Sequence, residues 1–174
     1  MPADYSPLVE LFYDTPAALG LFSSVEADDL PETFRSLLAH NDHMTVTLEA
    51  WHNSLVDVRV QREHSEGDVY ARESLLARQR DGGIVQYGIM RIDLAGLPEI
   101  VRLEIESQAL PLGRILIRHH VLRAVELIGL WRVNPSEILR SKLKAPEGAA
   151  VYARSARILV EGTPAVELLE IVTQ

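Results

Sequence analysis

The sequence predicts an α+β fold, in which a single antiparallel sheet of about six strands carries helices packed on one side. From residue 55 onwards, apolar residues recur with the two-residue period of strands. A glycine-rich turn separates two of these stretches, and two helical stretches that begin at prolines interrupt the series. Strands joined by hairpins pair antiparallel, so the inserted helices are expected to cover a face of the sheet.

Length and composition favour one domain spanning residues 1–174. Of these residues 47% are hydrophobic and 24% charged, which is ordinary for a globular protein. No internal repeat and no Ser/Gly/Pro-rich linker divides the sequence. Residues 1–40 are expected to form a helical N-terminal extension. Its helical stretches are expected at Pro7–Phe12, near Ala17–Phe22, and from Pro31 to about Leu38.

Residues 41–53 fit a helix and a strand equally well, and the strands are expected after them. The expected strands are Leu55–Glu63, Asp68–Arg78, Ile84–Ile92, Val121–Val133, Val151–Val160 and Ala165–Thr173. Asp81-Gly82-Gly83 tolerates positive φ and predicts a hairpin between the second and third of them. The expected helices run from Leu97 to about Ser107, from Pro111 to Leu116, and after Asn134-Pro135-Ser136.

Charge and residue inventory exclude several classes of function. The net charge is −8, the wrong sign for a domain that binds nucleic acid or anionic membranes. There is no cysteine, which removes disulfides, thiolate nucleophiles and iron–sulfur clusters. The N-terminus is acidic where a signal peptide is basic, and no apolar run approaches the roughly 20 residues that span a bilayer. We therefore expect a cytoplasmic protein without a nucleic-acid or membrane partner.

The last expected strand holds two glutamates, Glu167 and Glu170, which must point to opposite faces of the sheet. Both faces of this strand are largely apolar, so at least one carboxylate is expected to lie against the core. Such a group needs a cationic partner, or desolvation raises its pKa as a general acid at neutral pH requires. A structural ion pair or an exposed edge strand is the alternative interpretation.

Two further features can bind an anion. Arg72 lies in the middle of a strand, and its guanidinium can hold a carboxylate through two hydrogen bonds. The alternative for Arg72 is a cross-strand ion pair on the solvent face. The helix that begins at Pro111 has unpaired N–H groups at Leu112 and Gly113. The six histidines match no familiar metal-binding spacing, so no metal site is expected.

From about residue 40 to the C-terminus the sequence resembles the chorismate pyruvate-lyases, also called 4-hydroxybenzoate synthases. The motifs that carry the resemblance are His43-Met44-Thr45, Arg72-Glu73-Ser74-Leu75-Leu76, Pro111-Leu112-Gly113-Arg114 and Gly162-Thr163-Pro164. The resemblance implies a chorismate lyase-like fold. It also implies that Arg72 binds the substrate carboxylate, assisted by the backbone N–H groups of Leu112 and Gly113. Met44 would lie in a flap over the pocket.

The same resemblance places the family's terminal carboxylate at Glu170, or at Glu167 if the preceding hairpin is shorter. It implies a carbon–oxygen lyase that eliminates pyruvate from chorismate to give 4-hydroxybenzoate, without a metal or organic cofactor. A non-catalytic sensor or carrier of an aromatic acid is the alternative, as in effector domains of bacterial regulators that share a related fold. A lyase acting on another enolpyruvyl or cyclohexadiene acid is a third possibility. All three imply a small aromatic or cyclohexadiene carboxylate as the ligand.

Overall fold

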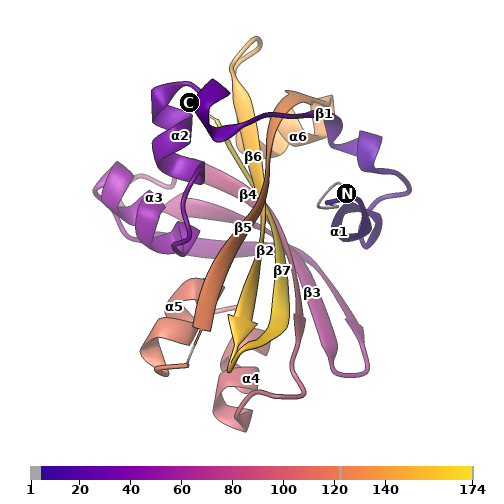
Figure 1. The fold of residues 1–174 in the computed structure, drawn as a ribbon, viewed down its shortest axis with the longest axis vertical. Coiled ribbons are helices and arrows are strands. Elements are labelled where there is room, and N and C mark those ends of the chain that lie inside the picture. The colour runs from indigo at the N-terminus through magenta and orange to yellow at the C-terminus, as the bar shows by residue number, and fades with distance from the viewer. Residues whose placement is uncertain (1–4, 122, 174) are drawn as a thin grey trace.

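One antiparallel sheet of seven strands forms the centre of the molecule (Figure 1). The structure is a computed structural model, and it describes residues 5–121 and 123–173. The strands are β1 (Gly20–Ser24), β2 (Val56–Glu66), β3 (Val69–Arg78), β4 (Ile84–Asp93), β5 (Arg123–Pro135), β6 (Val151–Val160) and β7 (Thr163–Thr173). They lie in the order β1-β5-β6-β7-β4-β3-β2. The predicted α+β class with a single antiparallel sheet is confirmed.

Four helices lie on one face of the sheet, the arrangement expected from the sequence. They are α2 (Glu32–Leu38), α3 (Met44–His52), α4 (Glu99–Glu106) and α5 (Leu112–Arg118). Two further short helices, α1 (Ser6–Glu10) and α6 (Glu137–Leu143), pack against part of the opposite face. None of the helices in the described part of the chain is long and apolar enough to span a bilayer.

The segment between residues 41 and 53, which fitted helix and strand alike, forms helix α3. Met44 and Leu48 lie four residues apart on one side of this helix, and both are buried in the cluster beneath it. Asn53 ends the helix in the left-handed conformation, with φ of 47°. Burial against the sheet thus decides an assignment that local periodicity leaves open.

The N-terminal part of the chain differs from the helical stretch expected near Ala17–Phe22. A short 3₁₀ turn at Pro16–Ala18 leads instead into β1, which pairs with the end of β5 and becomes the seventh strand. Gly20 permits this pairing, because a Cβ atom there would lie 2.3 Å from the carbonyl oxygen of Asn134. A five-residue strand is too short to show a period, so only its long-range partner reveals it.

Two apolar clusters occupy the face that α2 to α5 cover. One lies under α4 and α5 and includes Ile105, Ile115 and Ile158. The other lies under α2 and α3 and includes Phe34, Leu48 and Val172. Between them, the strands carry polar side chains and a glycine, and the packing leaves a pocket.

Candidate functional site

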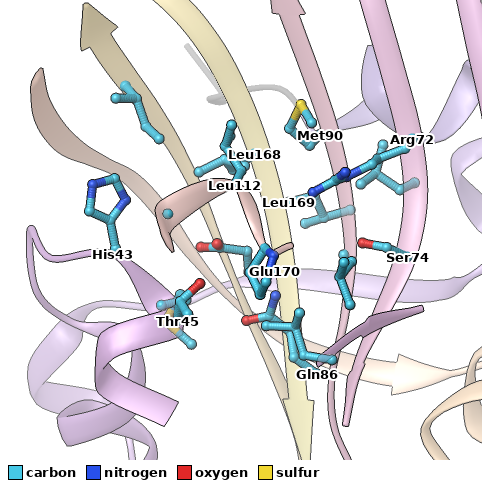
Figure 2. A pocket seen from close by; sticks show the side chains of 18 of the residues that line it. His43, Thr45, Arg72, Ser74, Gln86, Met90, Leu112, Leu168, Leu169 and Glu170 are labelled. Carbon is cyan, nitrogen blue, oxygen red and sulfur yellow. The ribbon is translucent and has the colours of Figure 1, made fainter. Parts of the chain in front are cut away.

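The pocket lies between the start of α3, the start of α5 and the middle of the sheet (Figure 2). Its cavity volume is about 60 Å³. Apolar side chains from the strands and from α5 form one part of its wall, and they are Met90, Leu112, Ile158 and Leu168. The structure therefore brings together the segments that the sequence analysis singled out.

The floor of the pocket follows from the register of the strands. Arg72 pairs with Met90, which pairs with Leu168. Two residues further along, Gly88 lies between Ser74 and Glu170. Because Gly88 has no side chain, the floor is open there, while its neighbours on both sides project polar groups. Arg72 and Glu170 thus lie on the same face of the sheet, in adjacent rows.

Arg72 is only 2% exposed, and its guanidinium faces the pocket (Figure 2). It donates two long hydrogen bonds, of 3.4 Å to the carbonyl oxygen of Ile105 and 3.3 Å to that of Leu110. No carboxylate among the described residues lies within ion-pair distance of it. Burial lowers the pKa of Arg72 from its ordinary value, although the guanidinium of arginine remains charged. Glu63, the cross-strand neighbour of Arg72 on β2, accepts a hydrogen bond from the Tyr70 hydroxyl and counteracts part of this lowering of the pKa. Arg72 therefore has a carboxylate nearby but forms no direct ion pair with it.

Glu170 is also buried and lines the pocket, whereas Glu167 lies on the opposite face, where it pairs with Arg91. The partner of Glu170 is Arg154, which the sequence analysis missed. The Nε of Arg154 donates a 2.6 Å hydrogen bond to Glu170, and its other nitrogens donate to the carbonyl oxygens of His40 and Asp42. This arginine is fully buried, so it both neutralises Glu170 and anchors the loop that leads into α3.

The roof of the pocket is formed where α3 and α5 meet. A Cβ atom at Gly113 would lie 3.1 Å from the Thr45 hydroxyl and 3.2 Å from the Cβ of His43, so the glycine lets the two helices approach closely. Leu112 and Gly113 line the pocket at the start of α5, as expected. Met44 is buried, and it lines the pocket while packing in the cluster under α2 and α3.

His43 at the roof is held in its neutral form. Burial, helped by the nearby guanidinium groups of Arg123 and Arg154, lowers the pKa of His43 to about 4. Its Nε2 accepts a 2.7 Å hydrogen bond from the Nε of Arg123. A neutral imidazole that accepts at Nε2 carries its proton at Nδ1, which makes His43 a hydrogen-bond donor at neutral pH.

Several residues of the pocket escaped the sequence analysis, although a signal for two of them exists. Arg154 and Gln86 are both polar residues within apolar strands, the pattern that drew attention to Arg72. Ser74, Thr45 and Gly88 carry no such signal, because small polar residues and glycines are common in strands and helices. Within residues 5–121 and 123–173, no three His, Asp or Glu side chains are grouped so that they could hold a metal ion.

No protein-family model matches the sequence, and no curated protein matches it. Among solved structures, the fold is similar to that of PhnF from Mycobacterium smegmatis, with a TM-score of 0.55 and 10% sequence identity. That match covers 75% of this chain but only 63% of PhnF. At this identity, the similarity shows the fold alone. It is consistent with the chorismate lyase-like architecture expected from the sequence.

Two further solved structures resemble this chain with lower TM-scores. A GntR-family transcriptional regulator from Bacillus cereus has a TM-score of 0.44 at 10% identity, with 67% of this chain and 90% of that one covered. The C-terminal domain of the histidine utilization repressor from Pseudomonas syringae pv. tomato has a TM-score of 0.44 at 9% identity, with 68% and 91% covered.

Proposed function

We propose that this domain binds a compact carboxylic acid in the pocket between α3 and α5, and that it acts as a ligand-binding domain. The ligand that fits best is a small aromatic or cyclohexadiene carboxylate. The observation that carries the proposal is Arg72, a buried guanidinium on the wall of the pocket that forms no direct ion pair in the described part of the chain.

The charges of the pocket support an anionic ligand. Its charged residues are Arg72, Arg154 and Glu170, and the last two form an ion pair, which leaves one positive charge. The hydrogen bonds of Arg72 to Ile105 and Leu110 are long, so a ligand carboxylate that pairs with it directly would gain both an ion pair and the stronger hydrogen bonds of its planar fork. The backbone N–H groups of Leu112 and Gly113 at the start of α5 can add two donors.

The shape of the pocket supports a compact ring. Met90, Leu112 and Leu168 offer apolar surface beside Arg72. The cavity is small, with a volume of about 60 Å³. A single ring with a carboxylate therefore fits with small adjustments of the roof, whereas chorismate carries an enolpyruvyl group as well and needs a larger opening.

Binding without turnover is favoured because Glu170 already accepts a hydrogen bond from Arg154 at 2.6 Å. A carboxylate held in this way is an acceptor, suited to a hydroxyl group of the ligand, whereas protonation of a leaving oxygen requires an acid. The chorismate lyase reaction is the second candidate, since Arg72 and Glu170 do share one pocket. In that reaction the bond between the ring and the ether oxygen breaks and the neighbouring ring carbon, which carries the hydroxyl, loses its proton, so the ring becomes aromatic. The released enolpyruvate takes up a proton and leaves as pyruvate.

Titration calorimetry with 4-hydroxybenzoate and with benzoate tests the binding site. We expect Arg72→Met to weaken both ligands by about 10- to 100-fold, because each loses a charge-assisted pair of hydrogen bonds. Arg80→Met is the matched control, since Arg80 is exposed beside the β3–β4 turn. Equal affinity in the parent and in Arg72→Met would remove Arg72 from the site.

Incubation with chorismate separates the two candidate functions. We expect the purified protein to leave chorismate unchanged while it binds 4-hydroxybenzoate. Release of pyruvate that disappears in both Arg72→Met and Glu170→Gln would instead establish the lyase reaction and its residues.

A further inference from the structure

Gln86 on β4 lines the same pocket and has no assigned role. It is only 6% exposed, and its Oε1 is buried without any hydrogen-bond partner. Buried amides are almost always paired, so an unpaired one on the wall of a cavity points to a partner that the ligand supplies.

The register of the sheet places Gln86 at the end of the pocket remote from Arg72. Leu76 pairs with Gln86, Ser74 with Gly88, and Arg72 with Met90, so Gln86 lies two rows beyond Arg72. Four residues along a strand correspond to about 13 Å. Figure 2 shows Gln86 at the Glu170 end of the pocket and Arg72 near Met90. A ring anchored by its carboxylate on Arg72 would therefore turn its far edge toward Glu170 and Gln86.

The chemistry of these two residues limits what that edge can carry. The carboxylate of Glu170 only accepts hydrogen bonds, and its pairing with Arg154 leaves further lone pairs free. The amide of Gln86 either donates or accepts, because a half-turn of its terminal torsion exchanges Oε1 and Nε2. A hydroxyl group matches the amide in both orientations, and it matches Glu170 as a donor.

We infer that Gln86 is a specificity-determining residue that hydrogen-bonds a polar substituent on the ring edge opposite the carboxylate. Glu170 and Gln86 together then favour ring acids with two neighbouring hydroxyl groups over acids with one or none. This inference rests on the proposed binding of a carboxylic acid at Arg72, and it adds the class of substituent that the pocket selects.

The test compares 3,4-dihydroxybenzoate, 4-hydroxybenzoate and benzoate by titration calorimetry with the parent protein and with Gln86→Met, which keeps a similar length without the amide. We expect Gln86→Met to weaken 3,4-dihydroxybenzoate about tenfold and to leave benzoate within about twofold of the parent. Gln61→Met, at an exposed position of β2, is the matched control and should leave the affinity for each of the three acids unchanged.

A second measurement distinguishes specificity from a structural role. If the amide has no partner in the free protein, Gln86→Met should unfold at the same or a higher temperature than the parent when no ligand is present. A lower midpoint of thermal unfolding, or an equal loss of affinity for benzoate and 3,4-dihydroxybenzoate, would overturn the inference. If none of the three acids binds the parent, the proposed function itself fails, and the role of Gln86 fails with it.

Discussion

Two neighbouring residues of β3, Arg72 and Glu73, are both buried and charged, but they differ in how they are paired. Arg72 faces the pocket and forms no direct ion pair among the described residues, whereas Glu73 faces the opposite side and pairs directly with Arg62. Glu73 accepts hydrogen bonds from the hydroxyl groups of Tyr13 and Tyr87 and from Arg62. The fully hydrogen-bonded Glu73 stabilises the fold, while a buried guanidinium that forms no direct ion pair beside a cavity can bind a ligand carboxylate.

Replacing Glu73 should strongly destabilise the protein. Glu73→Ala leaves the buried hydroxyl of Tyr87 and the guanidinium of Arg62 without their acceptor, which should lower the free energy of unfolding by about 3 kcal/mol. Urea denaturation measures the change. Glu167→Ala removes an exposed glutamate that pairs with Arg91 and should cost less than about 1 kcal/mol. Similar losses in the two variants would contradict the structural role of Glu73.

The pKa of His43 predicts how stability depends on pH. Burial lowers the pKa of His43 to about 4 in the folded state, whereas an unfolded chain titrates near its ordinary 6.5. Between these values the unfolded state binds more protons, so stability falls as the pH decreases from about 6.5 towards 4. Lowering the pH from 7 to 5 should decrease the free energy of unfolding of both proteins. We expect the decrease in His43→Gln to be about 1–2 kcal/mol smaller than in the parent. Urea unfolding at the two pH values measures this, and equal losses would show that His43 is not buried in neutral form.

At the scale of secondary-structure elements, the site depends on the close contact between the first turns of α3 and α5. Arg114 of α5 forms an ion pair with Glu49 of α3, and Glu49 also accepts a hydrogen bond from the backbone N–H of Val56 at the start of β2. Arg154 ties the loop before α3 to β6. These contacts fix the positions of α3 and α5 over the pocket, so a small displacement of either helix should change the affinity for the ligand.

Gly113→Ala tests the contact between the two helices. The added Cβ would press on Thr45 and His43 at 3.1–3.2 Å, so we expect α5 to shift, the ligand to bind at least tenfold more weakly, and stability to fall by about 1–2 kcal/mol. Gly96→Ala is the control, because no atom lies within 4 Å of a Cβ at that position. Calorimetry with 4-hydroxybenzoate and thermal unfolding report the two effects. Unchanged binding in Gly113→Ala would show that the roof does not form part of the site.

At the scale of the whole molecule, the N-terminal residues form part of the structure around the sheet. Helix α1 and the residues around β1 bury Leu8, Val9 and Leu19 in the cluster on the face opposite the pocket. Helix α2 closes the other face through Phe34, Leu37 and Leu38. Both faces of the sheet are therefore covered where α1, α2 and α6 pack, which allows the second half of β7 to be buried on both sides, whereas Glu167 in its first half is exposed.

A pair of leucines two residues apart tests this contribution. Leu19 is fully buried, so Leu19→Ala should lower the free energy of unfolding by about 2–5 kcal/mol through lost burial and the cavity it leaves. Leu21 is 66% exposed, and Leu21→Ala should change it by less than about 0.5 kcal/mol. Urea denaturation measures both variants. Equal, small effects would mean that the N-terminal segment does not pack on the sheet.

The sequence by itself determined the class of the fold and which residues of the central strands share a face of the sheet, because both follow from local periodicity. Alternation along the last strand predicted that Glu167 and Glu170 face opposite sides, and the structure shows that they do. The hairpin at Asp81–Gly83 and the proline-led helices were recognisable in the same way, since turn and cap chemistry lies within a few neighbouring residues.

Only the tertiary structure decided which of these faces is the pocket and how its charges pair. The partner of Glu170 lies sixteen residues away at Arg154, the open floor at Gly88 depends on the register of three strands, and β1 exists because it pairs with β5. Such pairings join segments that are distant in the sequence, and burial depends on what covers them. Periodicity assigns a side chain to a face, but the packing of the whole chain determines whether that face meets solvent, core or ligand.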